Sequence, residues 1–267
     1  MTSSPSASSD RLRIVTTSWD DGDPSDLRVA ELLYARGLGG TFYVPITYEG
    51  HQVLDESDVR SLNRSGFEVG GHGFSHKVLP QLSSEEIARE LRICRNRLED
   101  VLGDGVRMFC YPKGRFSPKV IGHAKAAGYE GARTTRMFRQ ELDFDPFHMP
   151  TTLHAYPNTK MQYAKNLLRG GNLRGLLGYA SRFTWRQSWV TMAKMLFDRV
   201  LEEGGIWHLY GHSWLVKEMN LWDDLKQVLD YVSGREGVLH VTNAEVLPYL
   251  PRNVPATSPA LDLTPLK

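Results

Sequence analysis

Two adjacent aspartates, Asp20 and Asp21, come directly after an apolar run, in the segment Ser18–Gly22 with the sequence SWDDG. Neighbouring side chains at the end of a strand point in different directions, so one carboxylate can bind a metal ion while the other faces a substrate. Taken alone, the segment also fits an Asp-rich turn closed by a glycine. Its chemical use therefore depends on other metal-binding side chains in the chain.

Two histidines, His72 and His76, are four residues apart in the segment GHGFSH, which begins at Gly71. Two such side chains in one turn can converge on one ion, although capping or surface histidines can have the same spacing. With one of the aspartates they form a set of two nitrogens and one oxygen, which leaves positions open for water and substrate. This set predicts a catalytic divalent ion. Zinc is the first expectation, and other first-row ions fit because such a set selects weakly.

Further histidines follow later in the chain. The segment Ile206–His212 reads IWHLYGH and predicts an apolar strand that ends in His212. His208 would lie in the middle of that strand, where a histidine hydrogen-bonded within the core is expected. His148 and His154 could contact a substrate, but a structural role is expected for each.

Short apolar runs alternate with helical patterns along the chain. Ser83 and Glu86 form a capping box that predicts a helix ending near Gly103, and Ser117 before Pro118 predicts the start of another. Two further helices are expected over Asp26–Arg36 and Asp55–Ser65. The expected strands are Ile14–Ser18, Gly40–Val44, Phe67–Gly70, Val106–Cys110, Tyr129–Arg133, Ile206–Tyr210 and Val238–Thr242, with a further short strand over Met149–His154.

This order predicts an α/β fold, a distorted (β/α)7 barrel of parallel strands with right-handed crossovers. We expect one barrel domain over residues 11–250, with a helical insertion on the catalytic rim over 142–200 and tails over 1–10 and 251–267. Chemistry in such barrels lies at the carboxyl ends of the strands. The candidate residues all follow strand ends, namely Asp20, Asp21, His72, His76, the turn Tyr111–Gly114 and His212.

The segments SWDDG and EVGGHGFSH, some 50 residues apart, resemble the first two motifs of the polysaccharide deacetylase (NodB-homology, carbohydrate esterase) family. The resemblance covers about Ile14 to Gly131 and again Gly205 to Leu247. It implies that Asp21, His72 and His76 bind the metal ion, that Asp20 is the general base, and that His212 is the general acid.

The segment Phe109–Gly114, FCYPKG, resembles the family's third motif, commonly Arg-Pro-Pro-Tyr-Gly, but departs from it. Cys110 takes the place of the arginine that orients the base, so Arg115 or Arg133 would have to replace it. We expect Tyr111, Lys113 and Arg115 to contribute to oxyanion or substrate binding, with the amide of Lys113 as the oxyanion donor. The family's fourth motif has no counterpart that we can place.

Composition limits the remaining possibilities. The 267 residues carry a net charge of +1, which gives no reason to expect nucleic acid as a partner, and the two cysteines are too few for a disulfide framework. The polar start lacks the pattern of a signal peptide, and no apolar stretch is long enough for a membrane span. A cytoplasmic location is expected.

Residues 160–199 contain eight basic residues and one acidic residue, interleaved with leucine and aromatic side chains. Such a segment suits an anionic membrane surface or a phosphate-bearing substrate, and it also fits an amphipathic helix pair packed on the barrel. On the first reading, the enzyme would work at the inner face of the membrane.

Together these features and the family resemblance predict a metal-dependent hydrolase that removes an acyl group from an amino sugar or glycan intermediate. An N-acetyl group is the first expectation. O-deacetylation or deformylation of a lipid- or nucleotide-linked sugar is an alternative for the same residues. A sugar-binding relative without turnover is another, favoured by the altered third motif and opposed by the intact Asp, His and His212 set.

Overall fold

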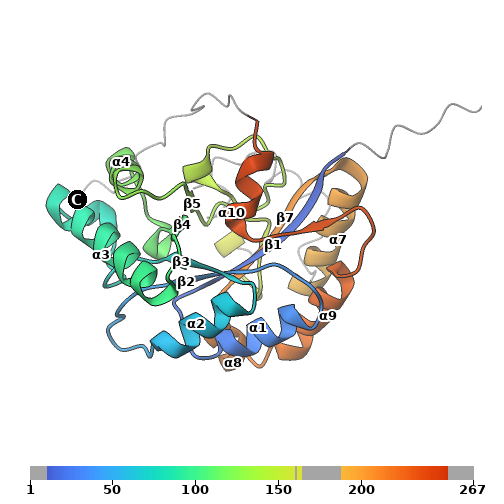
Figure 1. The fold of residues 1–267 in the computed structure, drawn as a ribbon. Coiled ribbons are helices and arrows are strands. Elements are labelled where there is room, and N and C mark those ends of the chain that lie inside the picture. Colours follow the sequence, from blue (N-terminus) through green and yellow to red (C-terminus); the bar gives the residue numbers. More distant parts are fainter. Residues whose placement is uncertain (1–10, 160, 164–187, 252–267) are drawn as a thin grey trace, which may run out of the picture.

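The computed structural model describes residues 11–159, 161–163 and 188–251. In this part of the chain, strands and helices alternate (Figure 1). The strands are β1 (Arg13–Asp20), β2 (Thr41–Val44), β3 (Glu68–Gly71), β4 (Met108–Cys110), β5 (Gly131–Arg133), β6 (Leu153–His154), β7 (Gly205–Gly211) and β8 (Leu239–His240). The helices are α1 (Asp26–Tyr34), α2 (Glu56–Arg64), α3 (Ser84–Leu102), α4 (Pro118–Ala126), α7 (Trp189–Glu203), α8 (Ser213–Glu218), α9 (Trp222–Val232) and α10 (Asn243–Val246).

The helix ends lie where the capping residues predict them. Ser83 and Glu86 form both hydrogen bonds of the capping box at the start of α3, and Gly103 ends that helix with a left-handed φ of 70°. The side chain of Asp55 caps α2, and that of Ser117 caps α4 just before Pro118. These three helices are therefore determined locally.

The strands pair in parallel in the order β5-β4-β3-β2-β1-β7-β6. Met149 continues the ring beyond β5, because its amide donates to the carbonyl of Ala132 and its carbonyl accepts from Thr134, while β6 pairs with β7. Residues 149–154 thus close a distorted (β/α)7 barrel between β5 and β7. β8 pairs only with the beginning of β1, at Ile14 and Val15. The last predicted strand is therefore a short edge beside β1, and the short strand predicted over Met149–His154 belongs to the ring.

Part of the range 142–200 also belongs to the barrel. α7 covers β7, and the indole of Trp207 on β7 donates to the carbonyl of Ala193 on α7 at 3.0 Å. Residues 160 and 164–187, which carry most of the basic segment, lie outside the described residues. Among the helices that the structure describes, none combines the length and apolar character needed to cross a membrane.

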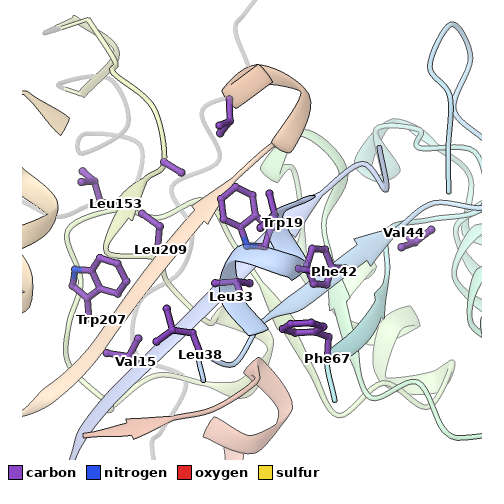
Figure 2. Close-up of a cluster of buried hydrophobic side chains, with 14 of the residues drawn as sticks. Val15, Trp19, Leu33, Leu38, Phe42, Val44, Phe67, Leu153, Trp207 and Leu209 are labelled. Atoms are coloured by element: carbon purple, nitrogen blue, oxygen red, sulfur yellow. The ribbon is translucent and has the colours of Figure 1, made fainter. Parts of the chain in front are cut away.

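The strands alternate strictly between an outward and an inward face. The outward side chains of β1 and β7, such as Val15, Trp19 and Trp207, pack with Phe42 and Leu33 in the layer between sheet and helices (Figure 2). Ile14 of β1 belongs instead to a separate cluster inside the barrel. This alternation places Asp20 at the top of the inward column of β1.

Glu68, at the beginning of β3, lies in a partly buried polar contact at the opposite end of the barrel. Its Oε2 accepts hydrogen bonds from the Thr41 hydroxyl at 2.7 Å and from the Ala244 amide at 3.0 Å. Burial raises the pKa of this carboxyl to about 7. The folded protein therefore holds a proton here that the unfolded chain releases near pH 4.5.

We expect the free energy of unfolding to fall as the pH rises from about 4.5 to about 7, because ionised Glu68 must stay buried. The contribution is on the order of 3 kcal/mol. In Glu68→Gln, which keeps an acceptor for Thr41 and Ala244, this contribution should vanish. Urea unfolding of both proteins between pH 5 and pH 8 measures it, and parallel pH curves for the two proteins would contradict it.

Candidate active site

A cavity of about 120 Å³ opens at the carboxyl ends of the strands. It brings together six of the residues predicted from the sequence, namely Asp20, Asp21, His72, His76, Lys113 and His212. Five further residues complete the wall: Tyr48, Gly114, Thr135, Tyr210 and Trp214. Residues far apart in the chain thus meet in one place, on the rim that the strand order predicts.

Asp21, His72 and His76 form a compact set of ligand atoms, all within 4.8 Å of one another. Oδ1 of Asp21 lies 3.5 Å from Nε2 of His72 and 3.3 Å from Nε2 of His76. Ligands about 2.0–2.2 Å from a tetrahedral ion stand roughly 3.3–3.6 Å apart. Oδ1 of Asp21 therefore has, from each histidine nitrogen, the spacing that a zinc-sized ion requires.

The two histidine rings are held in suitable orientations. Nδ1 of His72 lies 2.8 Å from the carbonyl oxygen of Cys110, so this nitrogen donates its proton to the backbone and Nε2 is directed at Asp21. The His76 ring packs against Tyr48 at 3.9 Å between centroids, and burial lowers the pKa of His76. Burial opposes ionisation of Asp21, but hydrogen bonds to the two histidines outweigh it and lower its pKa. A neutral imidazole and an ionised carboxylate are the forms that bind metal, so an arriving ion would displace the proton that the contacts with Asp21 and Cys110 favour on His72.

Asp20 lies beside this set in a pair with Arg133. The guanidinium donates to Oδ1 of Asp20, and Arg133 is fully buried. Burial alone would raise the pKa of Asp20, but the charge and hydrogen bond of Arg133, together with the charges of His72 and His212, outweigh it and lower this pKa. Of the two arginines predicted as replacements for the missing motif residue, Arg133 is the one that contacts Asp20. Arg115 is exposed and does not line the cavity.

Cys110 occupies the space next to this ion pair. Its thiol lies 3.5 Å from Oδ2 of Asp20, and together with His72 these residues make a second group of neighbouring ligand atoms. Burial raises the pKa of Cys110, so its sulfur is the neutral thiol, which is a poor ligand. Asp20 is moreover engaged by Arg133. The group of Asp21, His72 and His76 is therefore the better metal site.

Three non-glycine residues of the site have left-handed backbone conformations, with φ of 80° at Asp21, 53° at His76 and 56° at Lys113. Such conformations cost energy and persist where the surrounding fold imposes them. Gly114, with φ of 63°, has no room for a side chain, since a Cβ would lie 2.3 Å from the hydroxyl of Thr135. The turn after β4 is thereby pressed against the loop after β5, with Lys113 at the cavity.

His212 faces Asp21 from the other side of the cavity. Its Nε2 lies 3.8 Å from Oδ2 of Asp21, and its Nδ1 lies 3.4 Å from the hydroxyl of Tyr156. Burial lowers the pKa of His212, so the protonated ring would release its proton readily. The indole of Trp214, two residues further on, donates to Oδ2 of Asp21 at 2.9 Å.

Two predicted substrate-binding residues, Tyr111 and Arg115, lie away from the cavity. The hydroxyl of Tyr111 donates to the carbonyl of Phe147 at 3.1 Å, and its ring stacks on Phe116 in the core. Neither the side chain of Tyr111 nor that of Arg115 lines the cavity, so their contribution to substrate binding stays a prediction. The residue after β4 turns outward from the barrel, because Cys110 before it occupies the inward position.

The other histidines have structural partners. His208 is fully buried, with Nε2 at 2.8 Å from the Ser18 hydroxyl and Nδ1 at 2.9 Å from the Pro150 carbonyl, which confirms its core role. His148 pairs with Asp145 at 3.2 Å. His154 lies behind the cavity against Tyr210, and burial lowers its pKa to about 3.

Sequence reasoning missed four side chains of the cavity wall: Tyr48, Thr135, Tyr210 and Trp214. A signal existed for two of them. Tyr210 precedes His212 by two residues and shares its face of the strand, and Trp214 follows His212 by two residues. Tyr48 and Thr135 lie in loops after strand ends, where their direction depends on the loop conformation.

Comparison with known proteins agrees with this architecture. Residues 8–132 match the family model described as polysaccharide deacetylase. An uncharacterized 30.6 kDa protein of Geobacillus stearothermophilus is 25% identical over 104 residues, which is 38% of the chain and 38% of that relative. The alignment thus spans well under half of the relative's length.

Among solved structures, the fold resembles the chitin deacetylase of Colletotrichum lindemuthianum, with a TM-score of 0.60 at 14% identity over 90% of the chain and 89% of that protein. A family 4 carbohydrate esterase of Streptomyces lividans, solved with acetate, gives 0.53 at 13% identity over 86% and 91%. A family 4 pseudoenzyme of Bacillus anthracis gives 0.51 at 14% identity over 88% and 66%. These similarities establish the fold, the last of them in a protein described as a pseudoenzyme.

Proposed function

We propose a metal-dependent hydrolase that removes an acyl group, with N-acetyl as the first expectation, from an amino sugar or glycan. The proposal is supported by the match of residues 8–132 to the polysaccharide deacetylase model and by the barrel fold of the described residues. The observation that carries the proposal is the convergence of Asp21, His72 and His76 beside an Asp20 that Arg133 keeps ionised. Asp21, His72 and His76 would hold the ion, with zinc expected first. An ion so placed would lower the pKa of bound water and would polarise a carbonyl group.

Residues of the chain would carry out the remaining steps, which are proton removal, oxyanion stabilisation and proton donation. Asp20 accepts a proton from the attacking water as the water oxygen forms its bond to the acyl carbon. The amide of Lys113 at the cavity wall stabilises the negative charge that develops on the acyl oxygen. His212, on the other side of Asp21, donates a proton to the departing nitrogen as the carbon–nitrogen bond breaks. The products are the free amine and a carboxylate.

The nature of the sugar is a finer proposal. O-deacetylation and deformylation would use the same residues, and a sugar linked to a lipid or a nucleotide would suit the basic residues 160–199. Most of that segment lies outside the described residues, so membrane contact and a cytoplasmic location stay predictions from the sequence. A fold shared with a pseudoenzyme does not determine turnover, because function depends on the site.

The test is hydrolysis of a panel of N-acetylated, N-formylated and O-acetylated sugars, supplied free, as oligosaccharides and nucleotide-linked. We expect release of acetate or formate that chelation abolishes and that Zn²⁺ or Co²⁺ restores. The added ion would activate water and polarise the acyl carbonyl, which the side chains alone cannot do. A protein that binds the ion and the sugar but releases no acid would be a binding relative, whereas chelator-insensitive release would contradict the metal mechanism.

A further inference from the structure

Asp21 has two carboxylate oxygens with different surroundings. Oδ1 faces Nε2 of His72 and of His76, at 3.5 and 3.3 Å. Oδ2 accepts a hydrogen bond from the indole nitrogen of Trp214 at 2.9 Å. His212 Nε2 also lies near Oδ2, but its 3.8 Å separation is too long for a hydrogen bond.

We propose that Trp214 is a positioning residue for the metal site: its indole N–H holds Oδ2 of Asp21 so that only Oδ1 faces the ion. This inference rests on the proposed function, because it concerns the same metal site. An indole N–H is a donor only, so it binds the carboxylate without competing for the ion.

The placement of Trp214 in the fold supports this role. It lies in the first turn of α8, two residues after His212, and the fully buried residues Ser213 and Val216 anchor this helix. The ring is flanked by His212 and His51, at centroid distances of 5.6 and 5.9 Å. Its N–H is thereby directed at Asp21 by a short, anchored helix.

The physical consequence concerns coordination. A carboxylate with both oxygens free can bind an ion through either or both of them, and rotation of its terminal torsion costs little. Occupying Oδ2 removes this freedom and keeps Asp21 a single-oxygen ligand. Positions on the ion then stay open for water and substrate, as a catalytic site requires.

Trp214→Phe tests the hydrogen bond, because it removes the N–H and keeps an aromatic ring in the cavity wall. Zn²⁺ affinity is measured on the apo-protein by competition with a chromogenic chelator, and by the zinc-dependent rise in melting temperature. We expect a 10- to 100-fold larger Kd for the variant, the usual effect of losing such an outer hydrogen bond. Trp207→Phe is the matched control, since it removes the indole bond to the Ala193 carbonyl at 3.0 Å outside the site. Its Kd should equal that of the wild type.

The outcomes separate the two proposals. An unchanged Kd in Trp214→Phe, with wild type binding one Zn²⁺, would overturn the role of Trp214 and leave the metal site intact. An equal loss in Trp207→Phe would also overturn it, because the effect would then be general. If wild-type protein binds no Zn²⁺, Co²⁺ or other first-row ion, the proposed function fails and the inference fails with it.

Discussion

Asp20→Asn is expected to lower kcat/KM by about 100- to 10,000-fold, the range that a general base contributes, while one metal ion remains bound per chain. The amide keeps an acceptor for Arg133 but cannot take a proton from water. Asp21 and the two histidines, which hold the ion, are unchanged. Acid release from the N-acetylated sugar panel and metal content by mass spectrometry are measured on the same preparation.

His72→Ala is the companion variant, because it removes one ligand and leaves Asp20 in place. It should lose both metal and turnover. The pair of variants thus distinguishes a base from a ligand. Loss of the ion in Asp20→Asn would show that the two aspartates have been assigned the wrong way round.

Arg133→Met is expected to lower the free energy of unfolding by about 3–5 kcal/mol, because it leaves the charge of buried Asp20 without a partner. Arg133 and Asp20 are 0% and 3% exposed, so bulk water replaces little of the lost interaction. Activity should fall as well, because Asp20 loses the hydrogen bond from Arg133 that orients it and the positive charge that lowers its pKa. Denaturant unfolding and acid release from the sugar panel measure the two effects.

The double variant Asp20→Asn/Arg133→Met sharpens this test. It removes both charges, so it should be more stable than Arg133→Met alone. Its departure from the sum of the two single variants measures the direct interaction between the two side chains. Arg107→Met is the control, because Arg107 pairs with Glu130 at the surface, where its side chain is 42% exposed. Such a pair contributes about 0–1 kcal/mol. A loss as small in Arg133→Met would contradict the role of the buried pair.

Several features could be predicted from the sequence because they are local. The capping residues at Ser83, Asp55 and Ser117 lie within one turn of the amides that they bind. The spacing of His72 and His76 brings their rings together in one loop, with centroids 4.8 Å apart. Strand ends on one rim follow from parallel pairing, so Asp21 and His212 could be placed at the same site as these histidines.

The closing strand of the barrel could be only partly predicted. β6 has two residues and β8 has two, so neither carries a clear periodic pattern. Which of them completes the ring depends on long-range pairing. The carbonyl and amide of Met149 meet Thr134 and Ala132, whereas β8 reaches only the first residues of β1.

By itself, the sequence determined the candidate ligands and base, because Asp20, Asp21, His72 and His76 occupy two short motifs at strand ends. Only the tertiary structure decided which arginine pairs with Asp20 and which aromatic side chain donates a hydrogen bond to Asp21. Arg133 is the last residue of β5 and lies on the inward face, while Arg115 lies beyond a turn in solvent. Trp214 reaches Asp21 from a helix 193 residues away in the chain. The direction of a side chain depends on strand register and helix packing, which are set by contacts that no local pattern records.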